Sequence, residues 1–215
     1  MRVVGFLPRT REGMDWETFG NVIKAVAPVF TAGAACSGAY IAYRGLTKWH
    51  AETLGKRRIE LAEEVLADFY QARDIIKAAR SPFSYSHEGQ SRHRGENETE
   101  EDTRLLNSYF APTERLVSKA DFFAEAWARR YSFTAVFGSE AAGAYDDLFE
   151  VRNEIIVSVR SLISAHGHPV SPTDRTRWEN TIWAGAADDP IPTRIDRVID
   201  AIEAICRPAI QKATR

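Results

Sequence analysis

Two closely spaced histidines are among the side chains of this sequence that could support chemistry. His166 and His168 flank a glycine, and two imidazoles this close together could ligate a metal ion. No cysteine pair or second histidine pair accompanies them in the sequence, which disfavours a metal site. Imidazoles also suit a helix C-terminus, where free carbonyls meet the negative end of the helix dipole. We expect this second role for both histidines, and no metal site.

Acidic residues recur at helical spacing in two places. A helical bundle that holds two metal ions combines carboxylates with Glu-x-x-His pairs. No glutamate stands three residues before any of the five histidines. Acidic side chains are seldom buried without partners, so we expect both sets to lie on solvated helix faces. The sets are Glu60, Glu64 and Asp68, and Asp147, Glu150 and Glu154.

An arginine followed by a histidine could act on phosphate groups. The arginine would stabilise phosphate charge, and the histidine would carry a proton. Arg160 and His166 have such a spacing, which resembles the arginine–histidine motif of HEPN helical bundles, some of which are ribonucleases. The resemblance covers two residues, and Arg80 with His87 is similar to the motif as well. It implies an alternative function, a ribonuclease in which Arg160 and His166 are catalytic.

Other kinds of catalysis find no support in the sequence. Gly138-Ser139 lacks the pattern of a nucleophile elbow, and neither Cys36 nor Cys206 has a histidine close by in sequence. No glycine-rich loop precedes a Lys-Ser or Lys-Thr pair, as a phosphate-binding loop requires. We therefore expect no cofactor, and we expect a protein that is not an enzyme.

A stretch without charged residues runs from 25 to 43, between Lys24 and Arg44. At about 1.5 Å per residue, a helix of this length approaches the roughly 30 Å of hydrocarbon in a bilayer. Tyrosine and tryptophan follow at its C-terminal end, where amphipathic rings favour the membrane interface. The sequence therefore predicts a membrane-spanning helix over 21–43. The alternative is a buried helix in a soluble protein.

Basic residues follow this stretch more densely than they precede it. By the positive-inside rule the C-terminal part is then cytoplasmic, which predicts a single-pass protein of the inner (cell) membrane. The same residues would contact the headgroups of anionic lipids. They are Arg44, Lys48, Lys56, Arg57 and Arg58.

Small residues recur every four positions within the predicted span, at Ala34, Gly38 and Ala42. They share one face of a helix and would let a second helix approach closely. We expect this face to mediate self-association of the chain within the membrane.

Charge is distributed unevenly along the chain. Nine basic and four acidic residues up to Arg58 give that segment a formal charge of +5, so the remainder carries −7 of a net −2. An acidic domain argues against sequence-independent nucleic-acid binding, which depends on a basic surface. The two cysteines, Cys36 and Cys206, do not form a disulfide framework, and we expect reduced thiols.

Apolar residues beyond the span recur with helical periodicity, which predicts an antiparallel helical bundle. A helix from 46 to about 80 ends at Ser81, because the residue before a proline disfavours the α conformation. A polar segment over 81–97 is expected to be a mobile loop. Three further helices are expected over about 98–137, where Pro112 should start, break or kink the helix, over 139–166 with Ser139 as N-cap, and from about Pro192.

Two tryptophans lie in the proline-containing insert over 167–191. Trp178 and Trp183 bound a short amphipathic piece that could dock a partner protein. Covering the core is the alternative, and we favour it because large rings contribute most when they are buried.

The sequence thus predicts an all-α protein in which a single N-terminal transmembrane helix continues into a cytoplasmic antiparallel helical bundle. We expect it to act through protein–protein contacts, with the lipid bilayer and an unknown protein as partners and no nucleic acid. The expected segments are a tail (1–20), the span (21–43), a basic juxtamembrane stalk (44–58) and the bundle (59–215).

Overall fold

The computed structural model of the chain describes residues 16–85 and 87–211, and over this part the fold is all-α, as predicted. Six α-helices and one 3₁₀ turn account for its regular structure. They are α1 (Trp16–Ala79), α2 (Glu100–Val117), α3 (Ala120–Phe137), the 3₁₀ turn η1 (Ser139–Ala141), α4 (Ala142–Ser164), α5 (Pro172–Ile182) and α6 (Ile191–Gln211).

The chain divides into two compact units, and the boundary between Leu54 and Gly55 lies inside α1. Helix α1 crosses this boundary as one helix of 64 residues, so the predicted span and the segment after it belong to a single element. The helix begins at Trp16, earlier than the sequence suggests. Pro28 lies inside α1.

The first unit exposes its side chains. Every side chain from 24 to 50 is exposed, and α1 contains a stretch that is long and apolar enough to cross a membrane by length and composition. Two hydroxyl groups within this stretch bond back to the helix itself. Thr31 donates to the carbonyl of Ala27 at 2.9 Å, and Ser37 donates to that of Gly33 at 2.8 Å. The polar atoms of both side chains are therefore satisfied without an outside partner.

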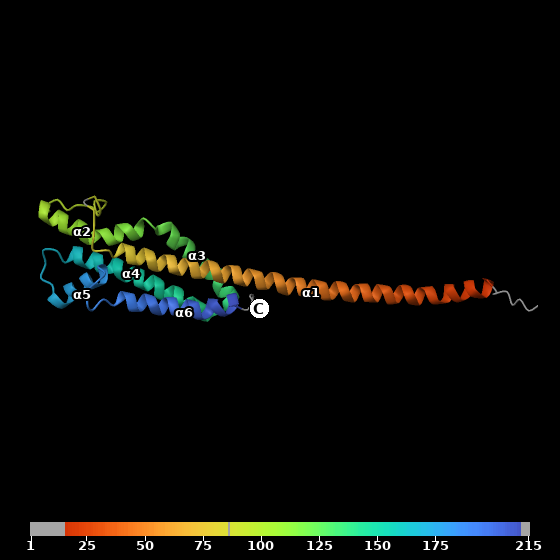
Figure 1. Cartoon of the computed structure of the whole chain (residues 1–215). Coiled ribbons are helices and arrows are strands. Elements are labelled where there is room, and N and C mark those ends of the chain that lie inside the picture. Colours follow the sequence, from red (N-terminus) through yellow and green to blue (C-terminus); the bar gives the residue numbers. More distant parts are fainter. Residues whose placement is uncertain (1–15, 86, 212–215) are drawn as a thin grey trace, which may run out of the picture. The chain divides into compact units, whose positions relative to one another are not determined.

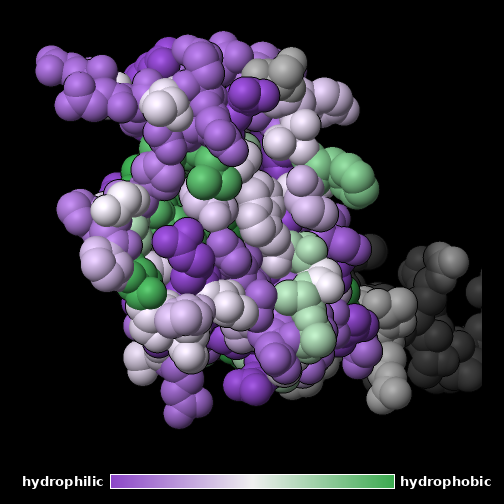
Figure 2. All heavy atoms as spheres, turned by 90° about the vertical axis from the view of Figure 1, so that its left-hand side faces the viewer, coloured by the Kyte–Doolittle hydropathy of each residue, from purple (hydrophilic) through white to green (hydrophobic). Residues whose placement is uncertain are grey.

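The second unit is an antiparallel bundle built around α4. Figure 1 shows α2 and α3 running back along the C-terminal part of α1, α4 returning beside them, and α6 running antiparallel to α4. Helix α4 contacts α2, α3, α5 and α6. Figure 2 shows the second unit from the end where α2 and α5 lie. This surface is mostly hydrophilic, and apolar side chains show in small patches between the hydrophilic ones.

The main core cluster joins α1, α3, α4 and α6, and it includes Leu116 of α2 and Ala141 of η1. In α1 its buried residues follow the predicted periodicity at intervals of three and four: Ala62, Val65, Phe69, Ala72 and Ile76. The Phe69 ring packs edge-on against Tyr145 of α4, with 4.9 Å between ring centroids. A second cluster joins α2, α4 and α5 through Leu106, Tyr109, Val159, Leu162 and Ile182.

The single helix predicted over 98–137 is wrong, because the structure has two helices there. Pro112 lies inside α2, and the break falls at Ser118 and Lys119. Lys119 leaves the helical conformation with φ −113° and ψ 20°. In α3, Phe133 is buried while Tyr131 is exposed.

The next helical segment begins at Ser139, as predicted. Ser139 is not the N-cap of the α-helix, however. Gly138 ends α3 with φ 97°, a conformation that glycine adopts readily. Ser139 then opens the η1 turn, and α4 begins after Ala141 without a side-chain cap.

Candidate functional site

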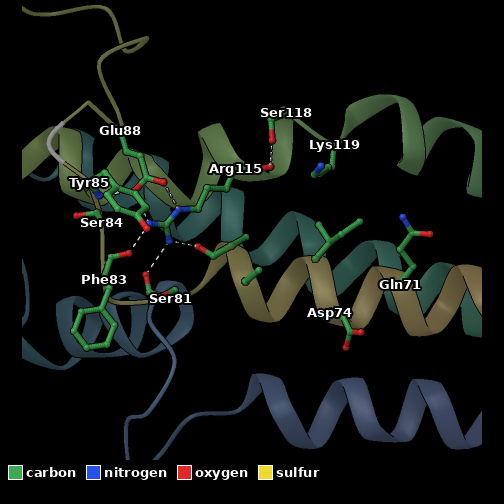
Figure 3. Close-up of a pocket in the computed structure, with 13 residues that line it drawn as sticks. Gln71, Asp74, Ser81, Phe83, Ser84, Tyr85, Glu88, Arg115, Ser118 and Lys119 are labelled. Atoms are coloured by element: carbon green, nitrogen blue, oxygen red, sulfur yellow. Dashed lines mark hydrogen bonds and ion pairs between the residues drawn. The ribbon is translucent and has the colours of Figure 1, made fainter.

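A groove of about 1040 Å³ lies beside the C-terminal end of α1, within the second unit. One wall comes from α1, another from the loop after it, and a third from the junction of α2 and α3 (Figure 3). Polar side chains on its rim include Gln71, Ser81, Ser84 and Ser118, and its apolar floor includes Ile75, Ala78 and Ala79.

Arg115 of α2 holds the loop that forms the groove wall (Figure 3). Its Nη1 donates to the carbonyls of Ala79 at 3.1 Å and Ser81 at 2.8 Å, and its Nη2 donates to that of Phe83 at 2.7 Å. Its Nε lies 3.0 Å from Oε1 of Glu88, and Nη2 reaches the other carboxylate oxygen. All five N–H groups of the guanidinium are thus engaged, a geometry that lysine could not reproduce.

Glu88 links Arg115 to a further residue of the loop. Its carboxylate also accepts a hydrogen bond from the backbone N–H of Tyr85 at 3.0 Å. The hydrogen bond from Arg115 lowers the pKa of Glu88, so the pair is charged at neutral pH. The Tyr85 ring stacks on His87, with 5.7 Å between ring centroids. Contacts with Glu88 and His87, two residues of the same loop, therefore hold Tyr85 in place.

A second set of contacts fixes the remainder of the loop. Glu114 accepts hydrogen bonds from the backbone of Gly89 at 2.5 Å and of Ser91 at 3.3 Å. Arg92 binds Glu98 through two hydrogen bonds of 2.8 and 2.6 Å. That interaction lowers the pKa of Glu98 to about 2. As predicted, residues 81–85 and 87–97 contain no helix, but hydrogen bonds to α2 hold them at several points.

Two aromatic rings on the loop are exposed at the groove. The side chain of Phe83 is 86% exposed and that of Tyr85 is 73% exposed. Rings so exposed on an anchored loop gain nothing from the folded core, and such positions commonly mark a contact surface.

Among the residues that the structure describes, Lys119 is the charged side chain of the groove that has no partner. Arg115 and Glu88 neutralise one another, and Asp74 lies 3.3 Å from Arg73. The side chain of Lys119 makes no hydrogen bond or ion pair with any residue that the structure describes. It leaves the chain at the break between α2 and α3, on the rim of the groove (Figure 3).

The groove supplies the features of a binding site. It combines an apolar floor, exposed rings, hydroxyl and amide groups and a lysine that has no partner among the described residues. Within the described residues, no three His, Cys, Asp or Glu side chains come together as a metal site would require. The arrangement can recognise a ligand that has both apolar and charged parts.

The arginine and histidine of the ribonuclease alternative lie elsewhere. Arg160 is exposed on α4, and His166 follows the end of that helix. His166 Nε2 is 2.8 Å from Oδ1 of Asp102, which also belongs to the capping box at the start of α2. His168 is exposed. Neither Arg160 nor His166 lines the groove. Their catalytic role stays a prediction.

Most members of the two acidic sets are exposed, as expected for solvated helix faces, and arginines from neighbouring helices pair with four of the six. Arg129 of α3 contacts Asp68 and lies 3.4 Å from Glu64. Arg194 of α6 contacts Glu154 and lies 3.9 Å from Glu150. Glu60, Glu64, Asp147 and Glu150 are exposed, and Asp68 and Glu154 are half-buried. These acids thus join helices of the bundle.

The two tryptophans of the insert pack against the second core cluster. Trp178 and Trp183 are half-buried beside Tyr109 and Ile182. This position matches the core-covering role, and docking of a partner there stays a prediction.

The residues predicted to face lipid are placed as follows. Ala34, Gly38 and Ala42 are exposed on α1, and a Cβ atom added at Gly38 would meet nothing within 4 Å. Among the basic residues, Lys48 lies 3.8 Å from Glu52, and the Arg44 guanidinium lies 5.7 Å from the Tyr40 ring centroid. Arg58 lies over the ring of Phe137 in the bundle, at 4.8 Å. Lys56 and Arg57 are exposed.

Sequence reasoning missed the groove residues. Phe83 and Tyr85 stand in a polar segment, and apolar rings in such a segment were the available signal. Arg115 and Lys119 gave no such signal, because their roles depend on where α2 ends.

The chain matches no known protein family, no curated protein and no solved structure.

Proposed function

We propose that the protein is a single-pass membrane protein whose cytoplasmic helical bundle acts by binding another protein. The observation that carries the membrane anchor is the apolar stretch of α1, whose side chains are all exposed over 24–50. Val29, Phe30 and Ile41 are each at least 70% exposed. At about 25 cal/mol per Å² of apolar surface, removing this stretch from water is strongly favourable.

The hydroxyl groups in the stretch support the same environment. A bilayer core offers no water to unpaired polar groups, so each must be satisfied within the helix. Thr31 and Ser37 meet this demand through their bonds to carbonyls one turn earlier. Tyr40, Tyr43 and Trp49 follow toward the interface, and the basic residues from Arg44 onward support a cytoplasmic C-terminal part.

Membrane attachment is tested by substitution in the middle of the stretch. Phe30→Lys together with Ala35→Lys should move the protein from the membrane pellet to the supernatant, because each lysine near the centre of the span costs about 2.5–3.5 kcal/mol on insertion. The matched control is Val157→Lys, which changes an exposed valine of α4 and should leave the protein in the pellet. The measurement is fractionation followed by alkaline extraction. Recovery of the unaltered full-length chain in the supernatant without detergent would contradict the anchor.

Orientation is tested by a reporter at the C-terminus. We expect activity from a reporter that works in the cytoplasm and none from a reporter that requires export. Activity of the exported reporter alone would reverse the proposed orientation.

Self-association within the membrane completes the proposal. The face formed by Ala34, Gly38 and Ala42 would pack against the same face of a second copy. Gly38→Ile should reduce chemical crosslinking of the chain in membranes, while Gly33→Ile, on a different face of α1, should not. Equal crosslinking of both variants and the unaltered chain would refute this contact.

The bundle supplies the second part of the proposal, a site for contact with a protein. The groove beside α1 holds two exposed aromatic rings and a free lysine. Rings on an anchored loop resemble the buried anchors of protein interfaces, since little conformational entropy is lost when they are covered.

A further inference from the structure

We propose that the groove binds a short segment of a partner protein that presents an apolar side chain next to a carboxylate. This inference rests on the proposal that the chain acts through protein contacts. The apolar side chain would lie between Phe83 and the floor at Ile75 and Ala78, and the carboxylate would pair with Lys119.

The first support is the fixed position of the aromatic wall. Phe83 points away from the core, but its backbone carbonyl is held by Arg115 at 2.7 Å. The neighbouring Tyr85 is held twice, through its N–H to Glu88 and through its ring on His87. A ligand that covers these rings gains apolar contact without ordering the loop first, which is the main saving in a preorganised site.

The polar rim favours a peptide over a lipid chain. Gln71, Ser81 and Ser84 line the groove, and none of their side chains makes a hydrogen bond within the described residues. A hydrocarbon chain would cover these groups without pairing them, and each unpaired group would lose its bond to water. A peptide carries backbone N–H and C=O groups along its length, so it can pair them while its side chains fill the floor.

Charge decides the chemistry of the segment. The groove contains two acids and two bases, and three of these four are already paired with an opposite charge. Lys119 is the exception, and its ammonium would attract a carboxylate as the ligand approaches. A basic segment would instead be repelled by the ammonium group of Lys119.

The test selects peptides on the full chain in nanodiscs of phosphatidylcholine, using a phage library of random twelve-residue peptides. Binding of the strongest selected peptides is then measured by fluorescence anisotropy. We expect them to combine an apolar residue with an acid. Phe83→Ser should weaken binding at least about tenfold, as loss of an anchor ring does. Lys119→Glu should weaken it about tenfold, and more strongly at low salt.

Two matched variants control for unspecific effects. Tyr131→Ser removes another exposed ring, from α3, and Lys77→Glu reverses an exposed lysine on α1 outside the groove. Both should change the affinity less than about twofold, since neither touches the ligand. Circular dichroism of all four variants should be unchanged, because the four side chains are exposed.

Three outcomes would overturn the inference. The library could yield no binder, the selected peptides could be basic, or they could bind the Phe83→Ser and control variants equally well. A lipid ligand would appear instead as laurate binding that depends on Lys119 in the absence of any peptide binder. Membrane fractionation reports on the anchor separately, so failure of the peptide selection leaves that part of the proposed function standing.

Discussion

Three arginines of the bundle direct their guanidinium groups at oxygen atoms of the protein rather than at solvent. Arg80 is 2% exposed, and it donates to the carbonyls of Thr181 and Trp183 at the end of α5 and to Asp189 before α6. Arg92 and Arg115 do the same for the loop after α1. Planar guanidinium groups suit this task because they hold several acceptors in fixed directions.

Arg115→Ala should reduce the free energy of unfolding by about 2–4 kcal/mol, because it leaves Glu88 and three carbonyls without their donor in a largely buried setting. Arg115→Lys should reduce the free energy of unfolding by an intermediate amount, since lysine keeps the positive charge but lacks the five N–H donors of the guanidinium. Urea unfolding measures both. Arg177→Ala is the control, because its pair with Asp174 is mostly exposed and contributes within about 0.5 kcal/mol. Equal losses for Arg115→Ala and Arg177→Ala would show that Arg115 does not hold the loop.

Glu98 should make the bundle sensitive to acid. Its pKa in the folded protein is lowered to about 2 from an ordinary value of 4.5, chiefly by the hydrogen bond from Arg92. A lowered pKa means that the stabilisation is present above about pH 4.5 and is lost as the pH falls toward 2. The melting temperature of Glu98→Gln should therefore fall less steeply between pH 5 and 3 than that of the unaltered chain. Parallel curves would show that the Arg92 pair does not contribute.

At the scale of elements, the turn after α1 depends on the close approach of two backbones. Gly89 has φ +79°, and a Cβ atom placed there would lie 2.0 Å from the carbonyl oxygen of Asn107 in α2. Glu114, two turns further along α2, accepts a hydrogen bond from the N–H of the same glycine. The turn can therefore pack against α2 only with a glycine at this position.

Gly89→Ala should reduce the free energy of unfolding by about 2 kcal/mol or more, because it adds both a steric clash and an unfavourable φ. Gly143→Ala is a matched control in α4, where the new Cβ meets nothing within 4 Å. It should stabilise the protein by about 0.5–1 kcal/mol through helix propensity. Thermal unfolding separates the two, and a neutral Gly89→Ala would mean that the loop can leave α2 freely.

At the scale of the whole molecule, the core of the bundle draws on α1 only from Ala62 onward. The second unit begins at Gly55 and so contains every buried residue of both core clusters. Its folding should not require the apolar stretch before it.

A chain of residues 55–215 should therefore be water-soluble, helical and cooperative in thermal unfolding. Its single cysteine, Cys206, reports on the core, because complete burial raises the pKa of the thiol to about 12. We expect Cys206 to resist maleimide until the fragment unfolds, while Cys36 in the full chain is exposed. Rapid labelling of Cys206 in the fragment would show that the first unit is needed for a packed core.

Helical periodicity predicted most of the fold. Ala62, Phe69 and Ile76 in α1, and Leu148 and Ile155 in α4, recur at helical spacing in the sequence, and all five are buried. Such patterns act locally, since one face of each helix must leave water whatever its partner is. The apolar stretch over 25–43 is likewise a property of the sequence alone.

The tertiary structure decided what local patterns do not encode. The break at Ser118 and Lys119 has no proline or glycine to mark it, yet it turns Phe133 into the core and leaves Lys119 free on the groove. Arg115 resembles any other helix-surface arginine until α2 packs beside the end of α1. The groove exists because a side chain of one helix satisfies carbonyls of a loop far from it in sequence, and such a pairing depends on three-dimensional packing rather than on residue spacing.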